Sequence, residues 1–185
     1  DKYYDSEILG TFNVLYMMAF VVNMFASFVL KPIISVLAEK YVKKNLSGFV
    51  KLVLRQIVII LIVTAVCIGG AWLLGVPVLG FLFGVDLGEY KGALCVVLIS
   101  GGFTALYQLL QYVIVIMRHQ YSTFICCGLT VVLTYLITPV LTKRYAIMGA
   151  SVSYAISIGF MSVMFLGFFV YHLQRDKKET VDSEI

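Results

Sequence analysis

Charged residues are scarce in this chain, and they are almost absent from the middle of its long apolar stretches. Of its 185 residues, 13% are charged and 61% are hydrophobic, and the mean hydropathy is +0.98. A typical soluble domain carries about 25% charged residues. This deficit excludes an ordinary soluble globular domain and predicts a protein that is embedded in a bilayer.

The sequence also lacks the residue groups that carry catalysis or metal binding. Its four cysteines include no C-x-x-C pair, and neither of its two histidines is near a cysteine. It has no G-x-x-x-x-G-K-[ST] phosphate loop and no nucleophile with a base beside it. We therefore expect no enzyme, no metal and no cofactor. His119 and His172 are expected among lipid head groups.

Five long apolar runs are the main feature that is present. Each is about 20 residues or longer, which as a helix suffices to cross about 30 Å of hydrocarbon. The sequence therefore predicts an all-α transmembrane bundle of about five spans over residues 1–172, with a charged cytoplasmic tail at 173–185. The predicted spans are residues 9–30, 49–74, 92–116, 121–141 and 146–171.

The basic residues indicate which way the bundle is oriented. If successive helices alternate in direction, ten of the fourteen lysines and arginines gather at one end. The positive-inside rule places this end in the cytoplasm, so the N-terminus lies outside and the C-terminus inside. The ten are Lys31, Lys40, Lys43, Lys44, Lys51, Arg55, Arg118, Arg175, Lys177 and Lys178, and the four are Lys2, Lys91, Lys143 and Arg144.

The first predicted cytoplasmic loop is the longest and mixes apolar residues with lysines. Pro32 suits the first turn of a new helix, where its missing N–H is of little consequence. One interpretation is a short helix over residues 32–47 that lies along the inner membrane interface. The other is a cytoplasmic extension of the first spanning helix, and the sequence does not decide between them.

Uncharged polar side chains recur at helical spacing in the third predicted span. They are Ser100, Thr104, Tyr107, Gln108 and Gln111, so one face of this helix is polar. One interpretation is hydrogen bonding between helices. The other is a hydrated cavity for a hydroxyl-rich substrate, because an amide both donates to and accepts from sugar hydroxyls. No Asp, Glu or His lies at mid-membrane depth, which argues against a proton relay.

The order of several short motifs resembles a known family. DKYYDSEILGTFNVLY is followed by LKPIISVLAEKYVKKN, GVPVLGFLFGVDLGEYKG, VIVIMRHQ and KRYAIMGASVSYAIS. This order is similar to that in the C-terminal half of the bacterial polysaccharide (O-antigen and capsule) flippases, of the multidrug/oligosaccharidyl-lipid/polysaccharide exporter superfamily. The resemblance covers nearly the whole chain and implies about the last five spans of the second of two lobes. A start at Asp1 and not at Met also leads us to expect a fragment of a longer protein.

The resemblance implies a transporter in the bacterial cytoplasmic membrane. It would flip undecaprenyl-diphosphate-linked oligosaccharide between leaflets for surface polysaccharide biosynthesis, by alternating access and without covalent chemistry. The implied partners are this lipid-linked substrate, membrane lipids and the N-terminal lobe, and no nucleic acid. The implied substrate-binding residues are Lys51, Arg55 and Arg118 for the diphosphate, and Tyr107, Gln108 and Gln111 for the sugars.

Other interpretations remain open at this point. The three basic residues also fit the positive-inside rule with binding to lipid phosphates. The family's cavity is often basic, whereas this chain has no mid-membrane Arg or Lys, so the central basic residues are expected in the other lobe.

A multidrug antiporter of the same superfamily is the first alternative function, and it would need an ionisable group from elsewhere. A membrane-embedded polysaccharide polymerase or acyltransferase is the second, and the short apolar outer loops disfavour it. A truncated chain without transport activity is the third.

Overall fold

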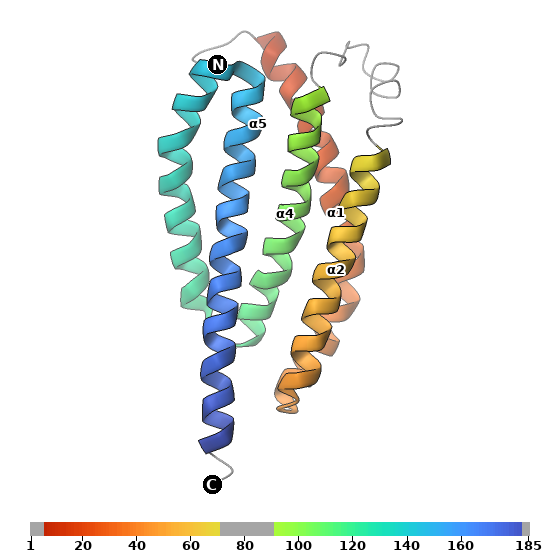
Figure 1. Ribbon diagram of the computed structural model, residues 1–185, viewed down its shortest axis with the longest axis vertical. Coiled ribbons are helices and arrows are strands. Elements are labelled where there is room, and N and C mark those ends of the chain that lie inside the picture. The colour runs from red at the N-terminus through yellow and green to blue at the C-terminus, as the bar shows by residue number, and fades with distance from the viewer. Residues whose placement is uncertain (1–5, 71–90, 183–185) are drawn as a thin grey trace.

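The computed structural model of the chain describes residues 6–70 and 91–182, and this part is helical apart from short turns (Figure 1). Its elements are α1 (Ser6–Val42), α2 (Leu46–Gly70), α4 (Lys91–Ile116) and α5 (Gln120–Asp182). α5 reverses direction near Tyr145, which gives it a first arm, Gln120–Tyr145, and a second arm that begins at Met148. Successive segments therefore run in opposite directions along one bundle axis (Figure 1).

Four segments in the described part of the chain are long and apolar enough to cross a membrane. They are Leu46–Gly70, Leu94–Ile116, Gln120–Tyr145 and Met148–Asp176. The shortest has 23 residues and extends about 35 Å, which exceeds the roughly 30 Å hydrocarbon core. The prediction of an all-α, multi-pass membrane bundle is confirmed at this level. The first predicted span, 9–30, lies within α1, and both its crossing and the orientation of the bundle stay predictions.

α1 continues as one helix past Pro32 and ends at Val42. Residues 33–42 thus extend α1, and no separate helix begins at Pro32. The helix has 37 residues and a length of about 55 Å, so it is longer than the hydrocarbon core is thick. Leu37, in the extension, is fully buried against the bundle. This packing favours continuation of the helix although Pro32 removes one backbone donor.

The same cap geometry ends both α1 and α4. The N–H of Asn45 donates to the carbonyl of Lys40, and the N–H of His119 donates to that of Ile114. These six-residue closures are Schellman motifs, whose left-handed position is usually glycine. Here Lys44 (φ 56°) and Arg118 (φ 62°) occupy it. At each of these two turns, a basic residue therefore occupies a backbone conformation in which glycine would have a lower conformational energy.

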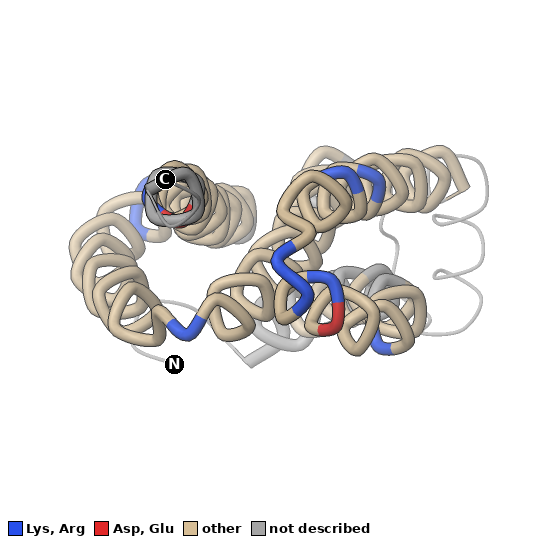
Figure 2. Tube along the Cα trace, turned by 90° about the horizontal axis from the view of Figure 1, so that it is seen from below, with Lys and Arg blue, Asp and Glu red and all other residues tan. Residues whose placement is uncertain are grey.

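We call this end of the bundle, which holds the turns around Lys44 and Arg118, the basic end. Figure 2 views it directly and shows Lys and Arg on several helix ends, with few acidic residues. It corresponds to the end that the sequence predicts to be cytoplasmic. The hairpin of α5, with Lys143 and Arg144, lies at the opposite end.

α4 occupies the centre of the bundle and packs against α1, α2 and α5. Its residues Ala105, Leu109, Leu110, Val113 and Ile114 are fully buried. These five residues belong to a hydrophobic core that also contains residues of the other helices and of the turn after α4, all toward the basic end. The additional core residues are Leu30, Leu37, Phe49, Val53, Ile60, Met117, Cys126, Phe165 and Phe169. All four cysteines are free.

Small residues allow two close backbone approaches. A Cβ atom on Gly102 of α4 would lie 2.5 Å from the Thr64 side chain of α2, so the absence of a side chain brings these helices together. A Cβ on Gly149 would collide with the backbone carbonyl of Leu141 across the hairpin of α5. Thr134 and Ser157 then join the two arms, with the Thr134 hydroxyl donating to Ser157 Oγ over 2.9 Å. These contacts follow the small-residue packing that is typical of membrane helices.

Candidate functional site

The polar face predicted on the third span divides into two parts in the structure. The upper part consists of Ser100 and Thr104, and the lower part, nearer the basic end, consists of Tyr107, Gln108 and Gln111. In the upper part, the Ser100 hydroxyl donates to the carbonyl of Val96 over 2.8 Å, and Thr104 donates to the carbonyl of Ser100 over 2.8 Å. Thr104 also lies 3.4 Å from the Tyr154 hydroxyl on the second arm of α5. Both hydroxyls are thus satisfied within the bundle, as is usual for Ser and Thr in membrane helices.

The lower part of this face is more open. Tyr107, Gln108 and Gln111 are all half-buried, and their helical neighbours Tyr112 and Val115 are 42% and 43% exposed. The Tyr107 ring stacks on Phe165 of α5, with ring centroids 6.3 Å apart. Gln111 makes no hydrogen bond to another residue in the described part of the chain. Tyr107 therefore contributes to packing, while Gln111 keeps its amide free for an external group.

The three basic candidates lie at the basic end, away from the glutamines. Lys51 and Arg55 are exposed on α2, one helical turn apart, and Arg118 is exposed in the turn after α4. Arg118 follows Gln111 by seven residues, which corresponds to about 10 Å along a helix axis. The structure thus does not bring the two predicted groups into one site. It places an open amide face above a basic helix end.

An exposed ion pair accompanies these cations on α1. Lys43, in the turn directly after α1, donates to Glu39 in the last turn of the helix over 2.6 Å. This hydrogen bond and the charge of Lys43 hold the pKa of Glu39 below its usual value of 4.5. The only described carboxylate of α1 beyond Pro32 is therefore already neutralised by a local lysine.

A cluster that the sequence did not predict lies beside Arg118. The rings of His119 and His172 stack nearly parallel, with centroids 3.8 Å apart and an interplanar angle of 8°. Asp176 Oδ1 lies 3.9 Å from His119 Nε2, and Asp176 Oδ2 accepts a 2.8 Å hydrogen bond from the Tyr41 hydroxyl of α1. We call His119, His172, Asp176, Tyr41 and Ser122 the histidine cluster.

His172 is buried, and only one of its two ring nitrogens has a hydrogen-bond partner. The side chain of His172 is 7% exposed, and its Nε2 lies 2.8 Å from the Ser122 hydroxyl. Its other ring nitrogen, Nδ1, is buried without a hydrogen-bond partner. The prediction that His172 lies among lipid head groups is therefore wrong: the residue is buried in the bundle, because His119 stacks on its ring and Ser122 pairs with its Nε2.

One further buried polar side chain escaped the sequence analysis. Gln56 of α2 is 2% exposed among Phe49, Val53 and Ile60, and its Oε1 has no hydrogen-bond partner. It is the only amide in α2, and it directly precedes the apolar run from Ile57 to Val63, which is a signal that could have found it. The cluster around His172 offered no such signal, because Tyr41 and Asp176 are 135 positions apart.

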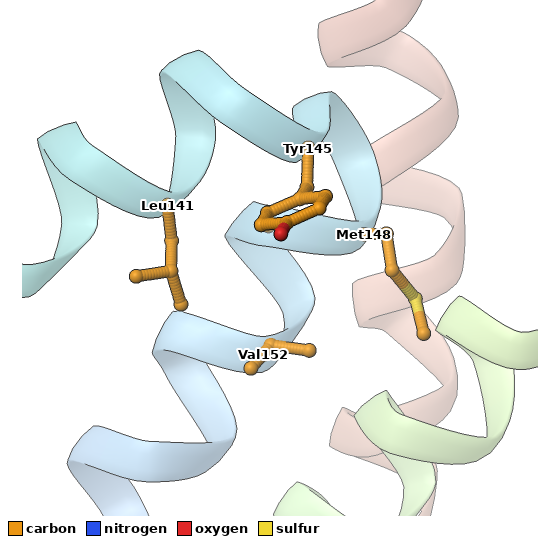
Figure 3. A pocket seen from close by; sticks show the side chains of 5 residues that line it. Leu141, Tyr145, Met148 and Val152 are labelled. Atoms are coloured by element: carbon orange, nitrogen blue, oxygen red, sulfur yellow. The ribbon is translucent and has the colours of Figure 1, made fainter.

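A small apolar pocket of ≈ 230 Å³ lies at the opposite end of the bundle, in the hairpin of α5. Leu141, Tyr145, Met148, Gly149 and Val152 line it, and Figure 3 shows the Tyr145 ring above Val152, with Leu141 and Met148 on either side. It has no charged side chain and no amide in its lining, so it does not fit an oligosaccharide or a phosphate.

The described residues contain no group of three or more His, Cys, Asp or Glu side chains that could hold a metal ion. Comparisons with protein-family models, with curated proteins and with solved structures find no match to this chain.

Proposed function

We propose that the chain is one lobe of a transporter that flips undecaprenyl-diphosphate-linked oligosaccharide across the bacterial cytoplasmic membrane. The substrate is lipid-linked, with a charged diphosphate and a hydroxyl-rich head. A lobe that handles it needs a surface for hydroxyl groups at membrane depth and cations at the leaflet where the substrate enters. No covalent step is required.

The observation that carries this proposal is the open lower face of α4. A half-buried amide without a partner is unfavourable in lipid, because water is absent there to satisfy it. Gln111 lies on the central helix α4, is half-buried beside the exposed Tyr112 and Val115, and makes no hydrogen bond to a described residue. Gln108, one turn earlier, is also half-buried, and it has Tyr107 as a hydrogen-bond partner within the bundle. A cavity lined by these amides would hydrogen-bond sugar hydroxyls, which both donate and accept.

The basic end supplies the cations. Lys51, Arg55 and Arg118 are exposed there, and each forms no ion pair with a described carboxylate. Arg118 occupies a left-handed backbone position that costs a non-glycine residue about 1–2 kcal/mol. A cost of this kind supports a role for the side chain beyond the turn. A diphosphate bound near these residues would leave the attached sugars on the side of Gln108 and Gln111.

Transport would follow from the movement of two lobes about a central cavity. The basic end would attract the diphosphate from the inner leaflet by charge. The amide face would then exchange hydrogen bonds with water for hydrogen bonds with sugars, which keeps the polar head solvated as the lobes rock. The second lobe, as a partner of this chain, is part of the proposal.

The test is the double substitution Gln108→Ala and Gln111→Ala in the intact protein, with surface polysaccharide and membrane protein level measured together. We expect export to fall while the protein level is unchanged. Gln174→Ala is the matched control, since Gln174 is an exposed amide on the second arm of α5 and lies off this face. Unchanged export in the double variant would assign both glutamines to packing and remove the support for this function.

A charge substitution tests the basic end separately. Replacing Lys51, Arg55 and Arg118 by glutamine should lower export, and replacing Lys143 and Arg144 at the opposite end should not. An equal loss in both variants would point to a general effect on membrane insertion, and the diphosphate role would then be withdrawn.

A further inference from the structure

The histidine cluster joins three segments that are distant in the sequence. Tyr41 belongs to the end of α1, His119 to the turn before α5, Ser122 to the start of α5, and His172 and Asp176 to its second arm. Each contact is at the basic end, where the extension of α1 and the two arms of α5 meet. Whatever changes the charge of these groups therefore acts on how the helices are held together at this end.

The geometry accommodates one added proton but not two. Asp176 Oδ1 lies 3.9 Å from His119 Nε2, so a proton on His119 creates an ion pair. His172 has no such partner: its Nε2 is paired with Ser122, and its Nδ1 is buried without an acceptor. A proton on both rings places two positive charges in parallel imidazoles whose centroids are 3.8 Å apart. Like charges at this distance disfavour the doubly protonated state.

Of the charged groups that the structure describes at the cluster, only the Asp176 carboxylate favours a proton on either ring, and it is one negative charge against two imidazoliums. Arg175 adds a positive charge near His172, and Arg118 directly precedes His119 in the turn. Tyr41 of α1 and Tyr171 of α5 contact the cluster through a hydroxyl and a ring, and neither adds a carboxylate. Asp176 is the carboxylate that faces both rings, and the Tyr41 hydroxyl already binds one of its oxygens.

We propose that His119 and His172 form a proton-operated latch that holds α1 and both arms of α5 together with one proton or none, and releases them with two. A second proton forces the rings apart, which carries Asp176 away from Tyr41 and separates the start of α5 from its second arm. The latch is independent of the proposed transport function, since it concerns contacts within this chain alone.

The chain permits a direct test because it contains only two histidines. The protein is produced with isotope-labelled histidine, its purification tag is removed, and the imidazole signals are followed by NMR in micelles from pH 8 to pH 5. We expect two separate proton-binding steps, the second about tenfold or more weaker than the first, as for interacting sites. In His119→Gln, His172 should take up its proton in one step and at higher pH than the second step of the unsubstituted protein.

Hydrogen exchange in the unsubstituted protein measures the release itself. Amide protection of residues 119–124 and 170–176, corrected for the intrinsic effect of pH, should be lost across the second step. The double variant His119→Gln with His172→Gln should keep the same protection at both ends of this pH range.

Two results would overturn the latch. If both histidines titrate in a single step that is unaffected by removing the other, the rings do not interact in solution. If the two steps occur and protection stays constant, the pair binds protons without holding the helices. Neither measurement uses transport, so failure here leaves the flippase proposal to its own test.

Discussion

Replacing Gly102 by alanine should separate α2 from α4. A Cβ atom at this position would lie 2.5 Å from Thr64 Cγ2, 2.6 Å from Thr64 Oγ1 and 3.1 Å from Thr64 Cβ. Favourable contact between carbon atoms begins at about 3.5 Å. Thr64 cannot turn away freely, because its hydroxyl donates to the carbonyl of Ile60 over 2.8 Å. The helices must therefore move apart.

The size of the effect follows from two opposing contributions. Overpacking of a helix contact costs about 1–3 kcal/mol. The higher helix propensity of alanine returns about 1 kcal/mol. Gly128 isolates the second contribution, since a Cβ there would meet nothing within 4 Å. We therefore expect Gly128→Ala to stabilise by up to about 1 kcal/mol, and Gly102→Ala to lie about 1–3 kcal/mol below it.

A double-mutant cycle with Thr64→Ala identifies the contact responsible. This substitution removes Cγ2 and Oγ1, the two nearest atoms, so Gly102→Ala should be tolerated in its presence, with a coupling of about 1–2 kcal/mol. The free energy of unfolding in mixed micelles, followed by circular dichroism, provides the measurement. If Gly102→Ala stabilises as much as Gly128→Ala does, α2 and α4 do not approach each other at Gly102 and the packing described here is incorrect.

Three further changes test local features of the bundle, each by the same unfolding measurement or by thermal denaturation. Lys44→Gly should stabilise by about 1 kcal/mol by relieving the left-handed backbone at this cap, whereas Lys44→Ala should not; equal effects would argue against the cap. Gln56→Met should be neutral or stabilising by about 1 kcal/mol, because it removes a buried carbonyl oxygen without a partner; a loss of more than about 2 kcal/mol would mean that Gln56 is hydrogen-bonded. Lys43 lowers the pKa of Glu39, so the pair stabilises the fold above pH 4.5, and this contribution is lost as the pH falls below that value. The small difference in stability between the unsubstituted protein and Lys43→Gln should therefore vanish in acid and in high salt. A difference that persists in acid would contradict this assignment.

The helical class and four of the long segments could be predicted because membrane insertion depends on local composition. An apolar run of 20 or more residues must satisfy its backbone internally, and a helix does so without help from the rest of the fold. Pro32 shows the limit of local reasoning. Its position suits a new helix, but the burial of Leu37 against the bundle is a tertiary contact, and this contact favours one continuous α1.

The candidate site could be predicted only where one helix carries it. The polar face of α4 follows from spacing alone, although the satisfied upper part and the open lower part could not be told apart from the sequence. The histidine cluster depends on the reversal of α5 near Tyr145, which brings position 122 beside position 172. That pairing is a property of the helix packing and leaves no periodic pattern.

The central claim is that this chain serves a flippase for lipid-linked oligosaccharide, and reconstitution tests it most directly. The intact protein would be placed in vesicles that carry undecaprenyl-diphosphate-linked oligosaccharide, and the fraction of the sugar accessible in each leaflet would be followed with time. We expect protein-dependent movement between leaflets, slowed by the Gln108→Ala and Gln111→Ala pair and unaffected by Gln174→Ala. Movement no faster than in protein-free vesicles, with the protein folded and inserted, would contradict it.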